Sequence, residues 1–172
     1  KISQPFTDAL ALYAIDLIAH NLVDVYKGRG TQESWEKITL ASTIGGMVIN
    51  TAGVTLAHGM EHPASGLKDI VHGKGLAALT PVIIEASYKE DHFKFAKIAR
   101  IFGGITADDL APKIRTLLKN LDLDVKLSDL GIEEKDIPWM AENCMKVSAA
   151  SIANNPVVFT QEEIAEIYKK AM

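Results

Sequence analysis

The sequence of 172 residues predicts an all-α protein. Apolar residues recur at helical spacing along most of the chain, and no segment alternates between apolar and polar residues for long enough to suggest a strand. Two Thr-x-x-acidic sequences, Thr106 with Asp109 and Thr160 with Glu163, have the form of capping boxes that begin helices. We therefore expect residues 1–172 to form a single helical domain.

The expected helices follow the apolar repeats and end at glycine or proline. Thr7 is the expected N-cap of the first helix, which ends before Gly28. Pro63 is expected to end a short helix, because proline disfavours helical backbone in the residue before it. The other helices are expected over residues 33–50, 54–61, 73–87, 92–102, 106–120, 133–146 and 160–170.

Two segments, residues 38–50 and 75–85, are apolar on nearly all sides, and the first is rich in small residues. A helix without a polar face belongs at the centre of a bundle, so we expect both segments to be buried there. The uncharged stretch 38–60 is long enough to span a bilayer. It also contains seven polar side chains, which favours a position inside a protein.

The composition excludes some functions. The net charge of −4 and the absence of a basic stripe argue against nucleic-acid binding. Cys144 is the single cysteine, so no internal disulfide can form, and the cytoplasm is the expected compartment. The chain begins at Lys1 without a methionine or a leader peptide, so we expect that residue 1 is not the natural start.

Three of the five histidines, His58, His62 and His72, fall within 15 positions. His58 and His62 are four residues apart and therefore share one helix face. His72 follows after one loop, at the start of the next apolar helix, so the three rings can converge. Imidazole nitrogen suits iron, zinc, copper or nickel. A histidine pair alone is common. A third histidine in an apolar neighbourhood strengthens the case for a metal site, with structural histidines as the open alternative.

The motif at residues 58–63 and 72–73, His-x3-His-Pro followed by His-Gly, resembles the signature of the iron-containing (group III) alcohol dehydrogenases. Other stretches resemble the same family, so the similarity extends over almost the whole chain. They are residues 5–12, 130–132, 136–138 and 155–156, the last followed by the Thr-capped helix.

This resemblance implies the helical C-terminal domain of a dehydroquinate synthase-like two-domain enzyme, whose N-terminal α/β domain is outside this sequence. It implies that His58 and His72 are metal ligands and that His62 lines the site beside the nicotinamide and the substrate, as the catalytic and cofactor-contacting residue. The metal would be Fe(II), with zinc as the alternative. The activity would interconvert alcohols with aldehydes or ketones, using NAD or NADP.

The sequence departs from the family pattern in two ways. The family holds its metal also with an aspartate and a histidine four residues later, located before the stretch that resembles residues 5–12. Those ligands and the Gly-rich nucleotide-binding half lie outside this sequence. Family members often carry a cysteine at about the position of Ser151, and the serine is expected to tune the substrate pocket. The chain alone is therefore expected to be inactive.

Asp16 and His20 have the spacing of the missing ligand pair. They lie on the polar side of the first helix, with Tyr13 and Asp24, so we interpret them as a solvated face. His92 is likewise expected at the surface.

Other functions stay open. A zinc polyol (glycerol-type) dehydrogenase or a dehydroquinate synthase-like lyase shares the same architecture, although the lyase should have more basic residues near its metal. A non-catalytic helical interaction domain with structural histidines is the third alternative. The expected partners are a small alcohol or aldehyde and the N-terminal nucleotide-binding domain, with a homodimer as one option for assembly. Neither nucleic acid nor a membrane is an expected partner.

Overall fold

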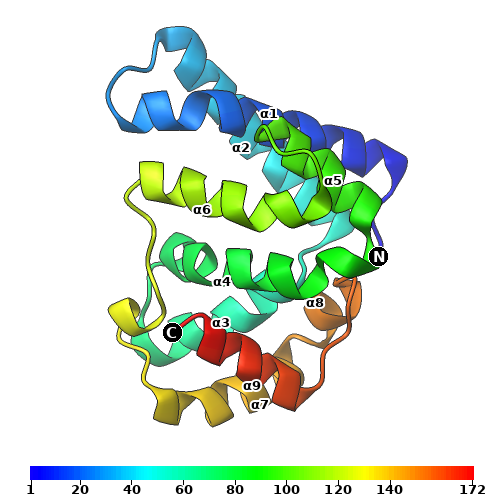
Figure 1. Cartoon of the computed structure of the whole chain (residues 1–172), viewed down its shortest axis with the longest axis vertical. Helices are drawn as coiled ribbons and strands as arrows, with labels where there is room; N and C mark the ends of the chain where they lie inside the picture. The colour runs from blue at the N-terminus through cyan, green and yellow to red at the C-terminus, as the bar shows by residue number, and fades with distance from the viewer. The chain divides into compact units, whose positions relative to one another are not determined.

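The computed structural model describes all 172 residues and contains nine α-helices, four short 3-10 turns and no strand (Figure 1). The all-α prediction is confirmed. The chain folds into two compact units. Unit 1 comprises residue 1 and residues 54–91 and 123–172, and unit 2 comprises residues 2–53 and 92–122. The assignment of residues 1–172 to one domain stays a prediction.

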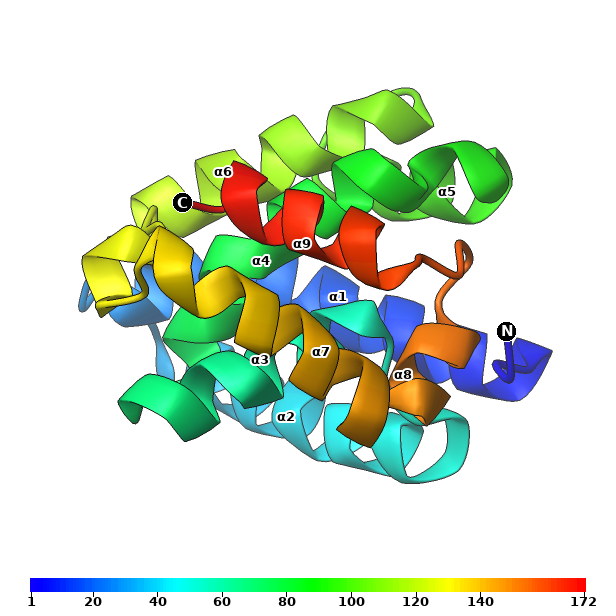
Figure 2. The same cartoon turned by 90° about the horizontal axis from the view of Figure 1, so that it is seen from below.

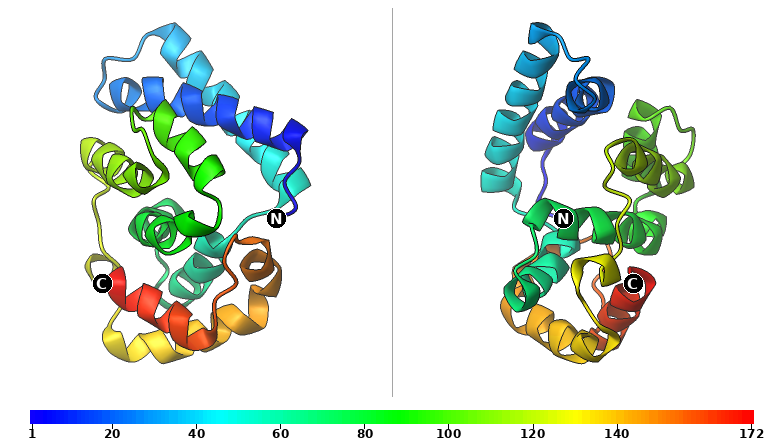
Figure 3. Two further views of the ribbon diagram at one scale, coloured as in Figure 1. Left: turned by 45° about the vertical axis from the view of Figure 1, so that its right-hand side comes forward. Right: turned by 90° about the vertical axis from the view of Figure 1, so that its left-hand side faces the viewer.

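Unit 2 is built on a pair of long helices, α1 and α2, that lie side by side (Figure 3). Their shared core consists of Ala14, Leu17, Ala41 and Ile44. The helices of this unit are α1 (Pro5–Tyr26), α2 (Gln32–Ala52), α5 (His92–Ile101) and α6 (Leu110–Asn120).

The prediction that residues 38–50 are buried on all sides is wrong, because much of α2 is exposed. Only Ala41, Ile44 and Ala52 of α2 are buried, whereas Met47 and Ile49 remain about half exposed, at 56% and 50%. Within unit 2, α1 covers one stripe of α2 and leaves the remainder of its surface open. The apolar composition of α2 therefore did not determine how much of its surface other helices cover.

Helix α1 begins earlier than expected. Gln4 is the N-cap and Pro5 occupies the first helical turn, where a missing N–H costs nothing. Thr7 is not the N-cap; its hydroxyl instead accepts the Gln4 backbone N–H at 2.9 Å. By length and composition α1 is also apolar enough to cross a bilayer, as are α2 and α3 taken together as one bent span.

Unit 1 surrounds the main hydrophobic core, which includes Leu56, Met60, Leu79 and Tyr168. Helix α3 packs against α4 and α7, and α7 packs against α9 (Figure 2). Most of the predicted segment 75–85 in α4 is buried, but Glu85 at its end is exposed. The helices of this unit are α3 (Leu56–Lys68), α4 (His72–Ser87), α7 (Ile137–Val147), α8 (Ala149–Asn154) and α9 (Gln161–Lys170).

The prediction that Pro63 ends this helix is wrong, because α3 continues through Pro63 to Lys68. Proline has no N–H to donate to the carbonyl four residues earlier, which belongs to Gly59. The Ser148 hydroxyl donates to that oxygen instead, at 3.1 Å. Gly59 also lets Ser148 approach, since a Cβ on Gly59 would lie 3.1 Å from the Ser148 Cβ. A residue distant in sequence thus keeps α3 intact through the proline.

Both predicted capping boxes are present. The Thr160 backbone N–H donates to Glu163 at 2.8 Å, and the Glu163 N–H donates to the Thr160 hydroxyl at 3.3 Å. Thr106 and Asp109 form the equivalent pair before α6. Helix α8 was not predicted, because six residues are too few to show a helical period.

Candidate metal centre

The junction of α3 and α4 brings His58, His62 and His72 together. His58 and His62 lie one turn apart on α3, and His72 is the first residue of α4. The ring centroids of His58 and His72 are 5.2 Å apart, those of His62 and His72 6.0 Å, and those of His58 and His62 6.2 Å. The predicted convergence of the three imidazoles is confirmed.

The three rings differ in exposure. His58 is partly buried, whereas His62 and His72 are exposed, so the cluster lies at the surface of unit 1 and can receive further ligands. Burial lowers the pKa of His58 below its usual value, and the neighbouring His72 and His62 lower that pKa further by charge repulsion. His58 is therefore poised in the neutral form, which is the form of imidazole that binds metal.

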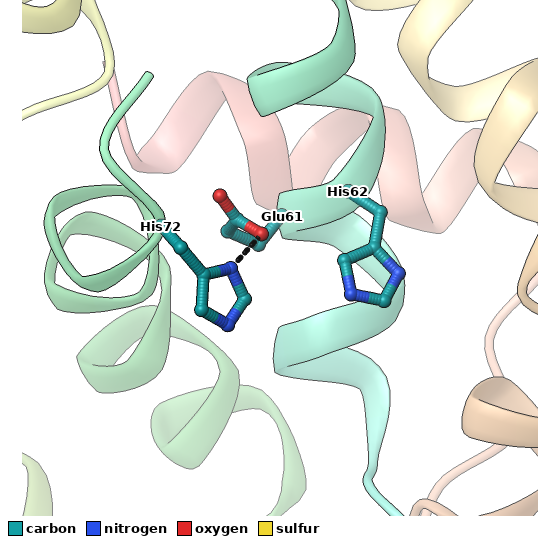
Figure 4. A group of neighbouring side chains, drawn as sticks. All are labelled: Glu61, His62 and His72. Atoms are coloured by element: carbon teal, nitrogen blue, oxygen red, sulfur yellow. Dashed lines mark hydrogen bonds and ion pairs between the residues drawn. The ribbon is translucent and has the colours of Figure 1, made fainter. Parts of the chain in front are cut away.

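A carboxylate that sequence reasoning missed lies beneath this cluster. Glu61 is fully buried, and one of its oxygens forms a hydrogen bond with Nδ1 of His72 (Figure 4). The other oxygen is bonded by the Ser65 hydroxyl. The sequence does not mark Glu61 as buried, because its partners are Ser65 and a residue of the next helix, His72.

The donor set fits a divalent transition metal. Imidazole nitrogen is the common protein ligand of Fe(II) and Zn²⁺. One donor atom from each of Glu61, His62 and His72 lies within 4.8 Å of the others, and the His58 ring is adjacent to both other rings. These donors come from α3 and α4, and the side chains of His62 and His72 are exposed.

Ser151, the predicted pocket residue, lies on α8 against the turn of α3 that carries His58. A Cβ on Gly59 would be 3.3 Å from the Ser151 Cβ. Ser151 is only partly buried. Its role in a substrate pocket stays a prediction.

The Asp16 and His20 pair lies on α1 in unit 2. Their side chains are 52% and 62% exposed, and Nδ1 of His20 is 2.9 Å from the backbone carbonyl oxygen of Asp16. His92 is exposed at the start of α5. These placements agree with the interpretation of all three as surface residues.

Comparison with known proteins extends the similarity over the whole chain. The sequence model described as "Fe-containing alcohol dehydrogenase family, C-terminal" matches residues 2–172. The 1,3-propanediol dehydrogenase of Klebsiella pneumoniae is 35% identical over 99% of this chain and 46% of its own length. An alcohol dehydrogenase of Saccharomyces cerevisiae is 32% identical over 98% of this chain and 45% of its own.

A solved structure gives the same relationship in three dimensions. The iron-containing alcohol dehydrogenase of Thermococcus thioreducens superposes with a TM-score of 0.87 at 32% identity, over 99% of this chain and 45% of that one. The chain thus spans about half the length of the relatives that it matches. On the family match and these similarities together, the chain belongs to the Fe-containing alcohol dehydrogenase family and corresponds to its C-terminal part.

Proposed function

We propose that these 172 residues are the helical catalytic part of a metal-dependent alcohol dehydrogenase, which interconverts an alcohol and an aldehyde or ketone with NAD or NADP. The observation that carries the proposal is the convergence of His58, His62 and His72 at the junction of α3 and α4. The relatives named 1,3-propanediol dehydrogenase and NADPH-dependent butanol dehydrogenase point to small alcohols or diols as substrates. The cytoplasm is the proposed compartment.

His58 and His72 would hold the metal, Fe(II) or alternatively Zn²⁺, together with an aspartate and a histidine supplied by another part of the full-length protein. When bound, the metal supplies Lewis-acid polarisation of the alcohol oxygen, and the nicotinamide accepts the hydride. His62 would stand outside the ligand set, although one of its nitrogens lies within 4.8 Å of donor atoms of Glu61 and His72. Because it is exposed, it could take up or release the hydroxyl proton and contact the nicotinamide.

The test compares three alanine variants in the full-length protein. His58→Ala and His72→Ala should each lose metal and turnover. His62→Ala should keep its metal but turn over more slowly, because a positioned acid–base group contributes about 10²–10⁴-fold to the rate. Metal content is measured by elemental analysis, and the rate of alcohol oxidation is measured with NAD and with NADP.

His20→Ala is the matched control, because it removes an exposed imidazole from α1 in unit 2. If His62→Ala loses metal as completely as the other two variants, the division of roles is wrong. If all three variants turn over normally, the histidines are structural and the proposed function is wrong.

A further inference from the structure

Resting on the proposed function, we propose that Glu61 is a positioning residue: its buried carboxylate accepts the Nδ1–H of His72, so that Nε2 of His72 would be left to bind the metal. Glu61 is not itself a metal ligand in this arrangement. The two ring nitrogens of His72 therefore have different tasks, one inside the protein and one at the site.

The first support is the complete use of the carboxylate. One Glu61 oxygen meets Nδ1 of His72, and the other meets the hydroxyl of Ser65, which also lies 3.0 Å from the carbonyl oxygen of Ile70. Glu61 has no solvent exposure, whereas the His72 side chain is 51% exposed. In Figure 4 the second nitrogen of His72 lies on the part of the ring turned away from Glu61. The buried side of His72 is thus fixed and its outer side is free.

The second support is a space built for the carboxylate. Gly75 lies against Glu61, and a Cβ on Gly75 would come within 2.8 Å of the Glu61 Cγ and 2.9 Å of its Oε1. Atoms at these separations would overlap, so the absence of a side chain at Gly75 allows the carboxylate to occupy its position. Helix α4 therefore supplies both the imidazole and the room for the group that orients it.

The third support separates positioning from direct ligation. The hydrogen bond between the Glu61 carboxylate and Nδ1 of His72 places a proton between these two atoms, so the lone pairs that they use in this bond are not offered to a cation. A metal-ligating histidine commonly donates its other N–H to a carboxylate, which fixes the tautomer and the ring orientation.

The experiment measures Co²⁺ affinity and the visible absorption of bound cobalt in the full-length protein. Glu61→Gln and Gly75→Ala should both weaken Co²⁺ binding about 10–100-fold, the usual effect of losing such a partner. At saturating cobalt both should keep the wild-type spectrum, because the ligand set is unchanged. Gly75→Ala removes no charge and displaces the carboxylate only by steric overlap.

Two controls match these variants. Glu142→Gln removes an exposed carboxylate from α7, and Gly66→Ala adds a methyl group where nothing lies within 4 Å. Both should bind cobalt as the wild type does. Circular dichroism of each variant establishes that the helices are retained.

Long-range ¹⁵N–¹H spectra of histidine-labelled, metal-free protein provide a readout independent of metal. His72 should carry its proton on Nδ1 in the wild type and lose this preference in Gly75→Ala. Cobalt binding within twofold of wild type in Glu61→Gln, or a His72 without a proton on Nδ1, would overturn the positioning role.

A changed cobalt spectrum in Glu61→Gln would overturn it in favour of direct ligation. If His58→Ala and His72→Ala bind cobalt as tightly as the wild type does, the proposed function itself is wrong, and with it the role of Glu61.

Discussion

The hydroxyl of Tyr168 donates a hydrogen bond of 2.5 Å to the backbone carbonyl oxygen of Met60. Met60 lies between His58 and His62 on α3, and Tyr168 belongs to α9. Both residues are fully buried. The last helix is therefore attached to the turn of α3 that carries two of the three clustered imidazoles.

Replacing Tyr168 by phenylalanine should lower the free energy of unfolding by about 0.5–1.5 kcal/mol, because it removes one buried hydrogen bond to the Met60 carbonyl oxygen. Urea unfolding followed by circular dichroism measures the change. Tyr13→Phe is the control, since Tyr13 is 50% exposed. Equal stability of the two variants would show that the hydrogen bond contributes nothing.

Ser148→Ala should destabilise unit 1 by about 1–3 kcal/mol, because the Gly59 carbonyl oxygen loses the hydroxyl that compensates for Pro63. In a Pro63→Ala background the backbone N–H of residue 63 becomes available, so the same serine replacement should cost less. A double-mutant cycle of unfolding free energies measures the difference. If Ser148→Ala costs the same in both backgrounds, the serine does not compensate for the proline.

The Cys144 thiol should be unreactive in the folded protein. Burial raises its pKa from 9.0 to about 12, so the thiolate is scarce at pH 8. Labelling by iodoacetamide at pH 8 should be slow in buffer and fast in urea.

The Cys144 thiol should also make stability depend on pH. Because its pKa is higher in the folded protein, the buried thiol's contribution to stability is complete below pH 9 and is lost as the pH rises towards 12. A Cys144→Ser variant, measured over this range, should lack that decline.

The Asp109 carboxylate should titrate below its usual value of 3.8. Hydrogen bonds from the backbone N–H groups of Thr106 and Ile105 hold its pKa down, and the Thr106 hydroxyl adds to the effect. Its contribution to stability is present above pH 3.8 and is lost as the pH falls through the lower folded value. Carbon-13 spectra of the side-chain carboxyl group measure the midpoint. A midpoint at or above 3.8 would contradict the capping role of Asp109.

Local sequence was sufficient where a feature depends on neighbours in the chain. The helical class follows from periodicity, and the capping boxes at Thr106 and Thr160 follow from a spacing of three residues. The meeting of His58 and His72 also followed, because one short loop separates their helices. Each of these features needs only contacts within about 15 residues.

Local sequence was insufficient where the deciding partner lies far away. The continuation of α3 through Pro63 depends on Ser148. The exposure of the apolar side chains of α2 depends on which helices pack against it. Glu61 was missed for a related reason. Ser65, His72 and Gly75 together surround its carboxylate, and no spacing between residues in the sequence predicts that they do so.

The serine that completes α3 has a consequence for biosynthesis. Ser148 follows Gly59 by 89 positions, so a ribosome makes the histidine helix long before it makes the donor that the helix lacks. During that interval the proline leaves a weak point between His58 and His62. We expect the rings of His58 and His62 to acquire their final spacing only after Ser148 has been synthesised and has reached the Gly59 carbonyl oxygen.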